Sequence, residues 1–502
     1  MSIILSIIIL SNAINYTGGF QEGDWVNFTN FRYVTSAATD QTIIYFGTTG
    51  GVIRYDRYAK RWLDPLTITD GIPHERINDI AYDPATGRIW VNTVNGAAYY
   101  QPTFNQWYSG GQFPHELARN DFYARDFPIL TTEFGYSYMD GAISDFNMLA
   151  YPLTMGVSDG YDFLYVGTWG LGPVIINTRY GDLNRLPFGP YNENISSIVV
   201  IDDLLWLGDN RLSGGTLTLF DMAGEKWEWY LTRYTDGLTS SQLTSGASGS
   251  KNAWLGTEYG LVRYRINEDD FFTYADFSTL PSTLILSVAA NSIGTFAGTD
   301  NGLGFISSDK KPKNNNSDST GNNKNNDHKK RPVVFPVKSL VGFRINCLEI
   351  INDFLYLGTH RGVIRVQLEG NKEFEYVDTP EGMLLTEIYD IDNSGDSLYF
   401  LTDRDIQIIN PKTGESSSLT DYRYFDRWQL RYLEIDDENI WAATDIGLWK
   451  YRISDGYSRL FTASDGMISD DIRGLVLNGD YIWLATPRGL IRFFWNDPGR
   501  ID

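Results

Sequence analysis

The chain has 502 residues, a formal net charge of −22, a single cysteine and 15% aromatic residues. The acidic balance argues against nucleic-acid binding, because phosphates require a basic face, and against an anionic membrane surface. Such a charge instead keeps a large β-sheet surface soluble and its strand edges unpaired. The single cysteine, Cys347, excludes an intramolecular disulfide. Its apolar strand pattern indicates a buried structural thiol.

Residues 1–13 have the pattern of a cleaved secretory signal. An apolar run from Ser2 to Leu10 precedes the small residues Ser11-Asn12-Ala13. The run is too short to span a bilayer, and small residues after an apolar core are typical of a cleavage site. The run lacks a basic start, so a first buried strand is the alternative. We predict a periplasmic or secreted protein, with no membrane-spanning segment after signal removal.

The rest of the chain repeats one short motif: an aromatic residue, any residue, Gly-Thr, a short turn and a second glycine. The clearest copy runs from Trp254 to Tyr264. Apolar residues alternate on both sides of the turn, which predicts two strands. Glycine in the turn accepts positive φ, so the motif predicts a tight hairpin. Ten copies begin at Tyr45, Trp90, Tyr165, Trp206, Trp254, Phe296, Tyr356, Tyr399, Trp441 and Trp483.

Most successive copies are 41–48 residues apart, which is typical of β-propeller blades of four strands each. In the fifth unit, residues 243–248 are predicted as the inner strand, 252–256 and 261–265 as the hairpin, and 271–275 as the outer strand. Asp-Gly pairs open several units and suit turns between blades. They lack the dense aspartate spacing of a calcium loop, so we predict no metal site.

The two ends of the chain are predicted to share one blade. Residues 24–28 resemble the last strand of a repeat but precede any complete unit, and the unit of Trp483 ends after three strands. Pairing the N-terminal strand beside residues 490–494, with Val26 near Ile491, hides an edge that invites aggregation. The predicted fold class is therefore all-β. It is a β-propeller over residues 20–502, with about ten four-stranded blades, the last closed by the N-terminal strand.

Two gaps between repeats are longer, at 75 and 60 residues. The first contains an insertion, residues 113–152, rich in aromatic and acidic side chains. The second contains residues 309–332, an Asn- and Lys-rich tract with almost no apolar content, predicted to be a disordered loop within the sixth blade. This tract separates six units from four, which does not match two equal rings. The ten units could form one large ring, two smaller rings or a ring with extra blades appended, and a single ring is favoured.

Two stretches carry a resemblance to a known family. The two-component-regulator propeller repeat resembles the pattern Ile77-Asn78-Asp79-Ile80, then Ile89 to Thr93, then Gly96. Residues 472–492 resemble the same repeat. The resemblance covers nearly all of residues 24–496. It implies a WD40-like extracytoplasmic propeller that senses ligands or binds proteins, often fused to a membrane-spanning kinase. No kinase sequence is present here, so sensing through a fused output domain is not expected. Ten blades also exceed the usual four to eight.

Catalytic motifs are absent from the sequence, and only four histidines occur. We predict no enzyme activity and no cofactor. The best site prediction follows from geometry, since hairpin turns gather on one face of a propeller and the aromatic insertion should join them. Aromatic rings with carboxylates suit sugars or a protein loop. The candidate ligand-binding residues are Trp169, Glu258, Asp300, His360, Asp403, Asp445, Tyr123, Tyr136 and Tyr138.

The predicted function is non-catalytic binding of a protein or carbohydrate ligand by a monomer, as a sensor-like or scaffold module. One alternative is a polysaccharide lyase or glycoside hydrolase on a propeller scaffold, because carboxylates from different blades can form a catalytic pair. Another is a structural component of a surface or secretion assembly. An enzyme should show a deep polar pocket with converging carboxylates, whereas a scaffold should show a broad flat face.

Overall fold

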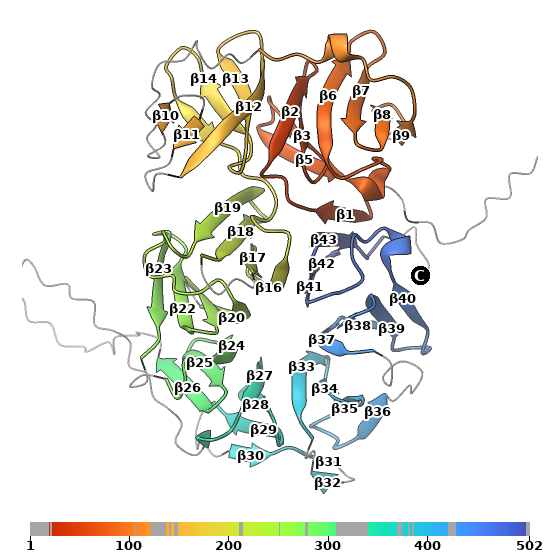
Figure 1. Ribbon diagram of the computed structural model, residues 1–502. Coiled ribbons are helices and arrows are strands. Elements are labelled where there is room, and N and C mark those ends of the chain that lie inside the picture. Colours follow the sequence, from red (N-terminus) through yellow and green to blue (C-terminus); the bar gives the residue numbers. More distant parts are fainter. Residues whose placement is uncertain are drawn as a thin grey trace, which may run out of the picture.

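The computed structural model describes residues 20, 23–104, 106–121, 137–139, 142–144, 149–209, 214–249, 251–276, 280–307, 340–368, 374–379, 382–383, 386–419 and 428–497. The predicted signal and the tract 309–332 lie outside these residues. The described chain consists of small antiparallel sheets, with the short 3-10 helices η1 (Ile68–Asp70), η2 (His115–Leu117) and η5 (Ala463–Asp465) (Figure 1). In the described residues, no helix is long and apolar enough to cross a membrane.

Each repeat unit forms one blade, and we number the blades 1 to 10 in chain order. Blade 1 has β2 (Val34–Thr39), β3 (Ile43–Thr48), β4 (Val52–Asp56) and β5 (Arg61–Leu66). Blade 2 has β6 (Ile77–Asp83), β7 (Arg88–Thr93), β8 (Gly96–Gln101) and β9 (Gln106–Ser109). Blade 3 has β12 (Ala150–Ser158), β13 (Phe163–Thr168), β14 (Val174–Asn177) and β15 (Leu183–Arg185). Within the insertion, β10 (Ser137–Met139) and β11 (Ala142–Ser144) add a hairpin to β12.

Blades 4 to 7 follow along the chain. They contain β16 (Ile195–Ile201), β17 (Leu204–Asp209), β18 (Thr216–Asp221), β19 (Lys226–Leu231), β20 (Leu243–Gly249), β21 (Asn252–Thr257), β22 (Gly260–Arg265), β23 (Asp270–Tyr274), β24 (Ile285–Ala290), β25 (Gly294–Thr299), β26 (Gly302–Ser307), β27 (Ile345–Ile351), β28 (Phe354–Thr359), β29 (Gly362–Gln367) and β30 (Phe374–Tyr376). Among the described residues, blade 6 has three strands.

Blades 8 to 10 complete the chain. They contain β33 (Ile388–Ser394), β34 (Ser397–Thr402), β35 (Ile406–Ile409), β36 (Ser416–Leu419), β37 (Leu430–Ile435), β38 (Asn439–Thr444), β39 (Leu448–Arg452), β40 (Ser458–Phe461), β41 (Gly474–Asn478), β42 (Tyr481–Thr486), β43 (Gly489–Phe494) and β1 (Trp25–Phe28). A two-stranded hairpin, β31 (Asp378–Thr379) and β32 (Gly382–Met383), links blades 7 and 8.

The structure confirms the predicted fold class: an all-β propeller of ten blade units, whose last blade is closed by the N-terminal strand. It also has a single closed ring, formed by blades 4 to 10. The inner strands β16, β20, β24, β27, β33, β37 and β41 lie side by side in that order, and β41 returns to β16 (Figure 1). The expectation that all ten blades belong to this ring needs correction. Because blade 10 packs directly on blade 4, blades 1 to 3 are left outside.

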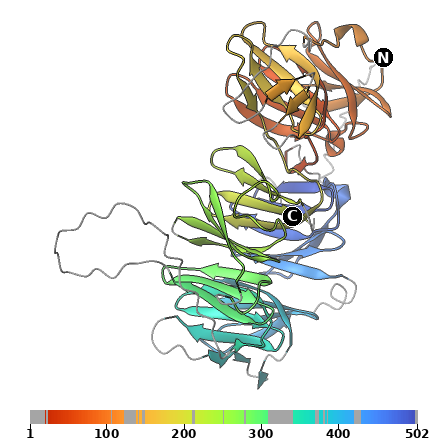
Figure 2. The same ribbon diagram turned by 60° about the vertical axis from the view of Figure 1, so that its left-hand side comes forward.

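Blades 1 to 3 form what we call the arc, in which β2 lies between β12 and β6. The outer strand of blade 1, β5, lies beside β1, so the arc attaches to the ring at its closing blade. Phe28, Phe31, Trp62, Phe188 and Trp227 form an aromatic cluster in the core at this junction. Figure 2 shows the arc at one end of the molecule, with the ring below it. Arc and ring therefore share one hydrophobic core.

The threonine of the repeated motif fixes the hairpin turn. Thr257 Oγ1 donates a hydrogen bond to the carbonyl of Gly260 (2.8 Å) and accepts one from the amide of Tyr259 (3.2 Å). These bonds satisfy backbone groups that the tight turn would otherwise leave unpaired. The same two bonds occur in the turns that begin at Thr48, Thr93, Thr299, Thr359, Thr444 and Thr486.

The glycine before that threonine leaves room for the next blade. A Cβ atom on Gly298 would lie 2.8 Å from Ile345 Cγ2, and one on Gly47 would lie 2.7 Å from Ile77 Cγ2. Each isoleucine is the first residue of the following inner strand. Because interiors are close-packed, this space is essential to the joint between two blades. The motif thus encodes both the turn and the packing of neighbouring blades.

The closing strand β1 pairs with β43 in a defined register. Trp25 faces Phe493, and their rings stack with centroids 3.8 Å apart. Val26 faces Arg492, and Asn27 faces Ile491. The sequence prediction that Val26 faces Ile491 is therefore wrong by one residue. No hairpin turn connects β1 to β43, so the sequence contains no turn that fixes their register.

This register predicts a specific crosslink. In a Cys347→Ala background, cysteines at Val26 and Arg492 should form a disulfide on oxidation, because facing residues of adjacent strands have Cα atoms about 5.5 Å apart. The matched control places cysteines at Val26 and Ile491, whose side chains point to opposite faces of the sheet. Non-reducing electrophoresis after limited proteolysis between the two sites detects the link. Efficient crosslinking of the control pair, and none in the first, would contradict the register.

Candidate functional site

The inner strands of the seven ring blades surround a central channel with a volume of about 1480 Å³. The side of the channel formed by β16, β20 and β24 presents small neutral residues, among them Ser197, Ser245 and Ser287. The opposite side, formed by β27, β33 and β37, presents carboxylates. The channel therefore has serines on one side and acids on the other, with apolar residues between them.

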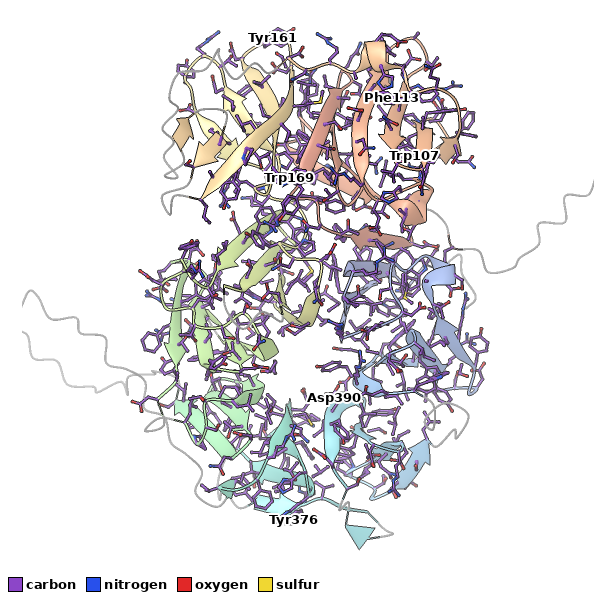
Figure 3. All side chains as sticks on the ribbon, viewed as in Figure 1. Trp107, Phe113, Tyr161, Trp169, Tyr376 and Asp390 are labelled. Carbon is purple, nitrogen blue, oxygen red and sulfur yellow. The ribbon has the colours of Figure 1, made fainter. Side chains whose placement is uncertain are left out.

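Four carboxylates make up the acidic side: Glu349 on β27, Asp390 and Asp392 on β33, and Glu434 on β37. Glu349, Asp392 and Glu434 each lie four residues after the start of their inner strand, so they share one level of the channel. Asp390 lies two residues earlier, and Figure 3 shows it at the edge of the channel. We call these four residues the channel carboxylates.

Three of the channel carboxylates also join neighbouring blades. Asp390 Oδ2 accepts a hydrogen bond from the amide of Leu433 (2.9 Å), and Asp392 Oδ2 accepts one from the amide of Ile435 (2.7 Å). Glu434 accepts a hydrogen bond from the amide of Leu477. Inner strands have one unpaired edge, so these bonds satisfy backbone amides that face the channel. The carboxylates thus tie β33 to β37 and β37 to β41.

The channel carboxylates hold protons more tightly than ordinary acids do. Burial raises the pKa of Glu349 to about 8, and the charges of Asp392 and Asp390 add to the effect. Burial also raises the pKa of Asp390 to about 7 and that of Asp392 to about 6, against the opposing effect of their backbone hydrogen bonds. The pKa of Glu434 is raised by burial and by the same neighbouring aspartates. Mutual repulsion means that these groups lose their protons successively.

The mouth of the channel carries aromatic and charged side chains. Tyr389 is 44% exposed and Tyr432 is 38% exposed, and both line the channel. Arg431 Nη1 contacts Asp471 Oδ1 at 2.6 Å and donates a hydrogen bond to the carbonyl of Ile472 (2.7 Å). Arg473 Nη1 reaches Asn194 at 2.7 Å on the next blade. The mouth can therefore contact a ligand by ring stacking, by ion pairs and by hydrogen bonds.

Two of the predicted site residues line this channel. Asp403 follows β34 and Asp445 follows β38, and both are exposed at hairpin turns. Asp445 Oδ1 accepts a hydrogen bond from the amide of Gln429 (3.1 Å), and Asp403 Oδ1 accepts one from Thr386 (3.3 Å). The turn between β28 and β29 holds His360, whose Nδ1 accepts a hydrogen bond from the amide of Arg344 (3.3 Å).

The other predicted site residues lie elsewhere. Glu258 and Asp300 are exposed at the hairpin turns of blades 5 and 6, outside the channel lining. Trp169 belongs to the arc, where its ring lies 5.1 Å from that of Tyr33 (Figure 3). Tyr138 is part of β10, and Tyr123 and Tyr136 lie outside the described residues. Among the predicted site residues that the structure describes, Asp403 and Asp445 line the channel.

Sequence reasoning missed the channel carboxylates. Their signal is visible in inner strands that interrupt apolar runs with acids, as in Ile388-Tyr-Asp-Ile-Asp and Leu430-Arg-Tyr-Leu-Glu. Cys347, by contrast, is free and buried beside them, as predicted, and burial raises the pKa of its thiol. Within the described ranges, no group of three or more His, Cys, Asp or Glu side chains has a metal-binding arrangement.

No protein-family model and no curated protein matches the chain. Solved structures of similar fold cover most of it at low identity. PorZ, an essential bacterial surface component of the type-IX secretion system of Porphyromonas gingivalis, is 12% identical over 92% of this chain and 68% of that one, with a TM-score of 0.48. The extracellular domain of the putative one-component system BT4673 from B. thetaiotaomicron is 13% identical over 93% and 71%, with a TM-score of 0.43. Likenesses of this strength say nothing about activity or ligand.

Proposed function

We propose that the chain is a non-catalytic extracytoplasmic binding module whose ring receives a protein loop at the mouth of its channel. The observation that carries the proposal is the combination of a wide mouth, lined by the exposed rings of Tyr389 and Tyr432, with the channel carboxylates below it. Tyrosine is enriched among the residues that contribute most of the binding energy at protein interfaces. The extracytoplasmic location rests on the apolar run at residues 2–10.

The chemistry of the channel favours a basic side chain on the incoming loop. A lysine or arginine inserted beside Glu349 stabilises the ionised carboxylate, so binding releases a proton from a group whose pKa is about 8. Affinity should therefore rise as pH increases toward 8. The net charge of −22 also attracts a cationic partner over a distance.

A displayed library of cyclic peptides tests this proposal. Peptides enriched on the wild-type protein should contain lysine or arginine, should bind more tightly at pH 8 than at pH 5.5, and should lose at least about tenfold in affinity on Tyr389→Ala, as truncation of a central aromatic does. Tyr376→Ala is the matched control, because Tyr376 is 42% exposed but lies at the outer edge of the ring (Figure 3). Enriched peptides that bind Tyr389→Ala as well as wild type would refute the proposal.

Glycoside hydrolysis is a second candidate, favoured by one observation. Glu349 has a pKa of about 8 while Asp392 has one of about 6, and such a separation suits an acid and a base on the neighbouring strands β27 and β33. The hydrogen bonds of Asp390, Asp392 and Glu434 to backbone amides speak for a structural role instead. Release of reducing sugar from soluble polysaccharides, abolished by Glu349→Gln, would establish the hydrolase and displace the binding proposal.

A further inference from the structure

The repeated aromatic residue is buried in nine of the ten blades. Its exposed fraction ranges from 0% for Trp206 to 7% for Phe296, because the next blade covers it. Trp90 in blade 2 is the exception and is partly exposed. Blade 2 is the end of the arc (Figure 1), and the segment after β9 approaches this tryptophan at Gly111.

Around Trp90 the open face of blade 2 forms an aromatic row across three strands. Trp90 on β7 faces Tyr99 on β8, which faces Tyr108 on β9. The ring centroids are 4.8 Å apart for the first pair and 5.2 Å apart for the second. Arg88 lies over the ring of Tyr99, 4.2 Å from its centroid. We call these residues, with Asp79 and Asn92, the blade-2 face.

This face differs from those of the other nine blades by a polar residue, Asn92, at a position where they have glycine, Leu401, Ala443 or Ala485. In blades 1, 3, 4, 5, 6 and 7 the position of Asn92 is a glycine, which leaves space for the first inner-strand residue of the following blade. Asn92 fills that space, and its Nδ2 contacts Asp79 Oδ2 at 3.4 Å. A polar pair at the centre of a blade joint would be desolvated on packing, which opposes a second copy of this chain as occupant.

The blade-2 face instead matches a ligand that is apolar on one side and rich in hydroxyl groups. We propose that it binds a neutral polysaccharide. Pyranose rings stack their C–H faces on aromatic side chains, and Asn92, Asp79 and Arg88 supply donors and acceptors for hydroxyl groups. The charges of Asp79 and Arg88 balance on the face, while the net charge of −22 repels acidic glycans, so a neutral chain is favoured. This site is separate from the ring channel and from the function proposed for it.

Native affinity electrophoresis tests the proposal with four neutral polysaccharides in the gel: hydroxyethylcellulose, laminarin, mannan and xyloglucan. At least one should retard the wild-type protein, and Trp90→Ala should abolish the retardation. Tyr161→Ala is the matched control, because Tyr161 is 84% exposed at another place on the arc (Figure 3). Tyr108→Ala gives a second probe of the row if Trp90→Ala alters the unfolding temperature.

Three results would overturn the assignment. No retardation in any of the four gels would exclude neutral polysaccharide binding, and retardation that both Trp90→Ala and Tyr108→Ala retain would place binding elsewhere. Sedimentation of the wild type as a dimer that Trp90→Ala dissociates would show that the face is a contact between copies. Tryptophan fluorescence that changes on titration with the retarding polysaccharide, in the wild type and not in Trp90→Ala, would support it.

Discussion

Replacing Gly358 by alanine should lower the free energy of unfolding by about 3 kcal/mol, the upper end of the usual cost of overpacking a core. Gly358 is the motif glycine of blade 7, and a Cβ there would lie 2.8 Å from Ile388 Cγ2 of blade 8 and would collide with Cys347 Sγ. Both neighbours belong to inner strands that other blades hold in place. Neither can move without opening a blade joint. Urea unfolding measures the loss.

Blade 10 shows how this clash can be relieved. There the motif position is Ala485, and the facing inner-strand residue is Gly474, the reverse of the Cys347 and Gly358 pair. Cys347→Gly should therefore recover part of the stability that Gly358→Ala loses, with a coupling energy above about 1 kcal/mol in the double-mutant cycle. Costs that simply add in the double variant would show that the clash with Cys347 is not the cause.

Stability should fall between pH 5.5 and pH 8.5, and the channel carboxylates should account for much of the fall. Their pKa values are raised in the folded protein, so the folded state binds more protons than the unfolded state over this range. Stability then decreases as pH rises. The destabilising contribution is absent below about pH 4, where both states are protonated, and complete above about pH 8.

Glu349→Gln should reduce this pH dependence. The amide cannot ionise, so the variant should be more stable than wild type at pH 8.5 by about 1–3 kcal/mol and nearly equal to it at pH 4, where Glu349 is largely protonated in both states. Thermal unfolding at the two pH values gives the difference. Glu258→Gln, at an exposed turn, is the control and should unfold like wild type at both. If the stability of Glu349→Gln depends on pH as strongly as that of the wild type, Glu349 does not cause the pH dependence.

The blades were predictable because the residues that specify each blade lie close together in the sequence. The motif glycine, the threonine of the turn and the alternating runs specify a hairpin without reference to the rest of the chain. The division into ring and arc was not predictable in this way. It depends on which blade follows another in space, and blade 2 differs from the other blades locally in having a polar residue, Asn92, where they have glycine, alanine or leucine. A polar residue at that position was a readable signal.

The candidate site was predicted less well than the fold. Asp403 and Asp445 could be assigned to hairpin turns on one face because turn positions follow from the repeat, and both line the channel. The channel carboxylates were missed because acids on a strand edge look like ordinary solvent-facing residues in sequence. Their environment arises only when β27, β33 and β37 come together. Trp169 was misplaced for the opposite reason, since its turn is typical but its blade belongs to the arc.

The pairing of β1 with β43 should affect the folding and unfolding rates of the ring as well as its structure. Trp25 cannot meet Phe493 until nearly the whole chain has been synthesised, so the closing contact joins residues of very large sequence separation and forms late. Until then blade 10 lacks its outer strand, and β43 presents an unpaired edge. Once β1 has paired with β43, unfolding of blade 10 requires separation of these two strands. We therefore expect the protein to unfold slowly, although each blade alone has only modest stability.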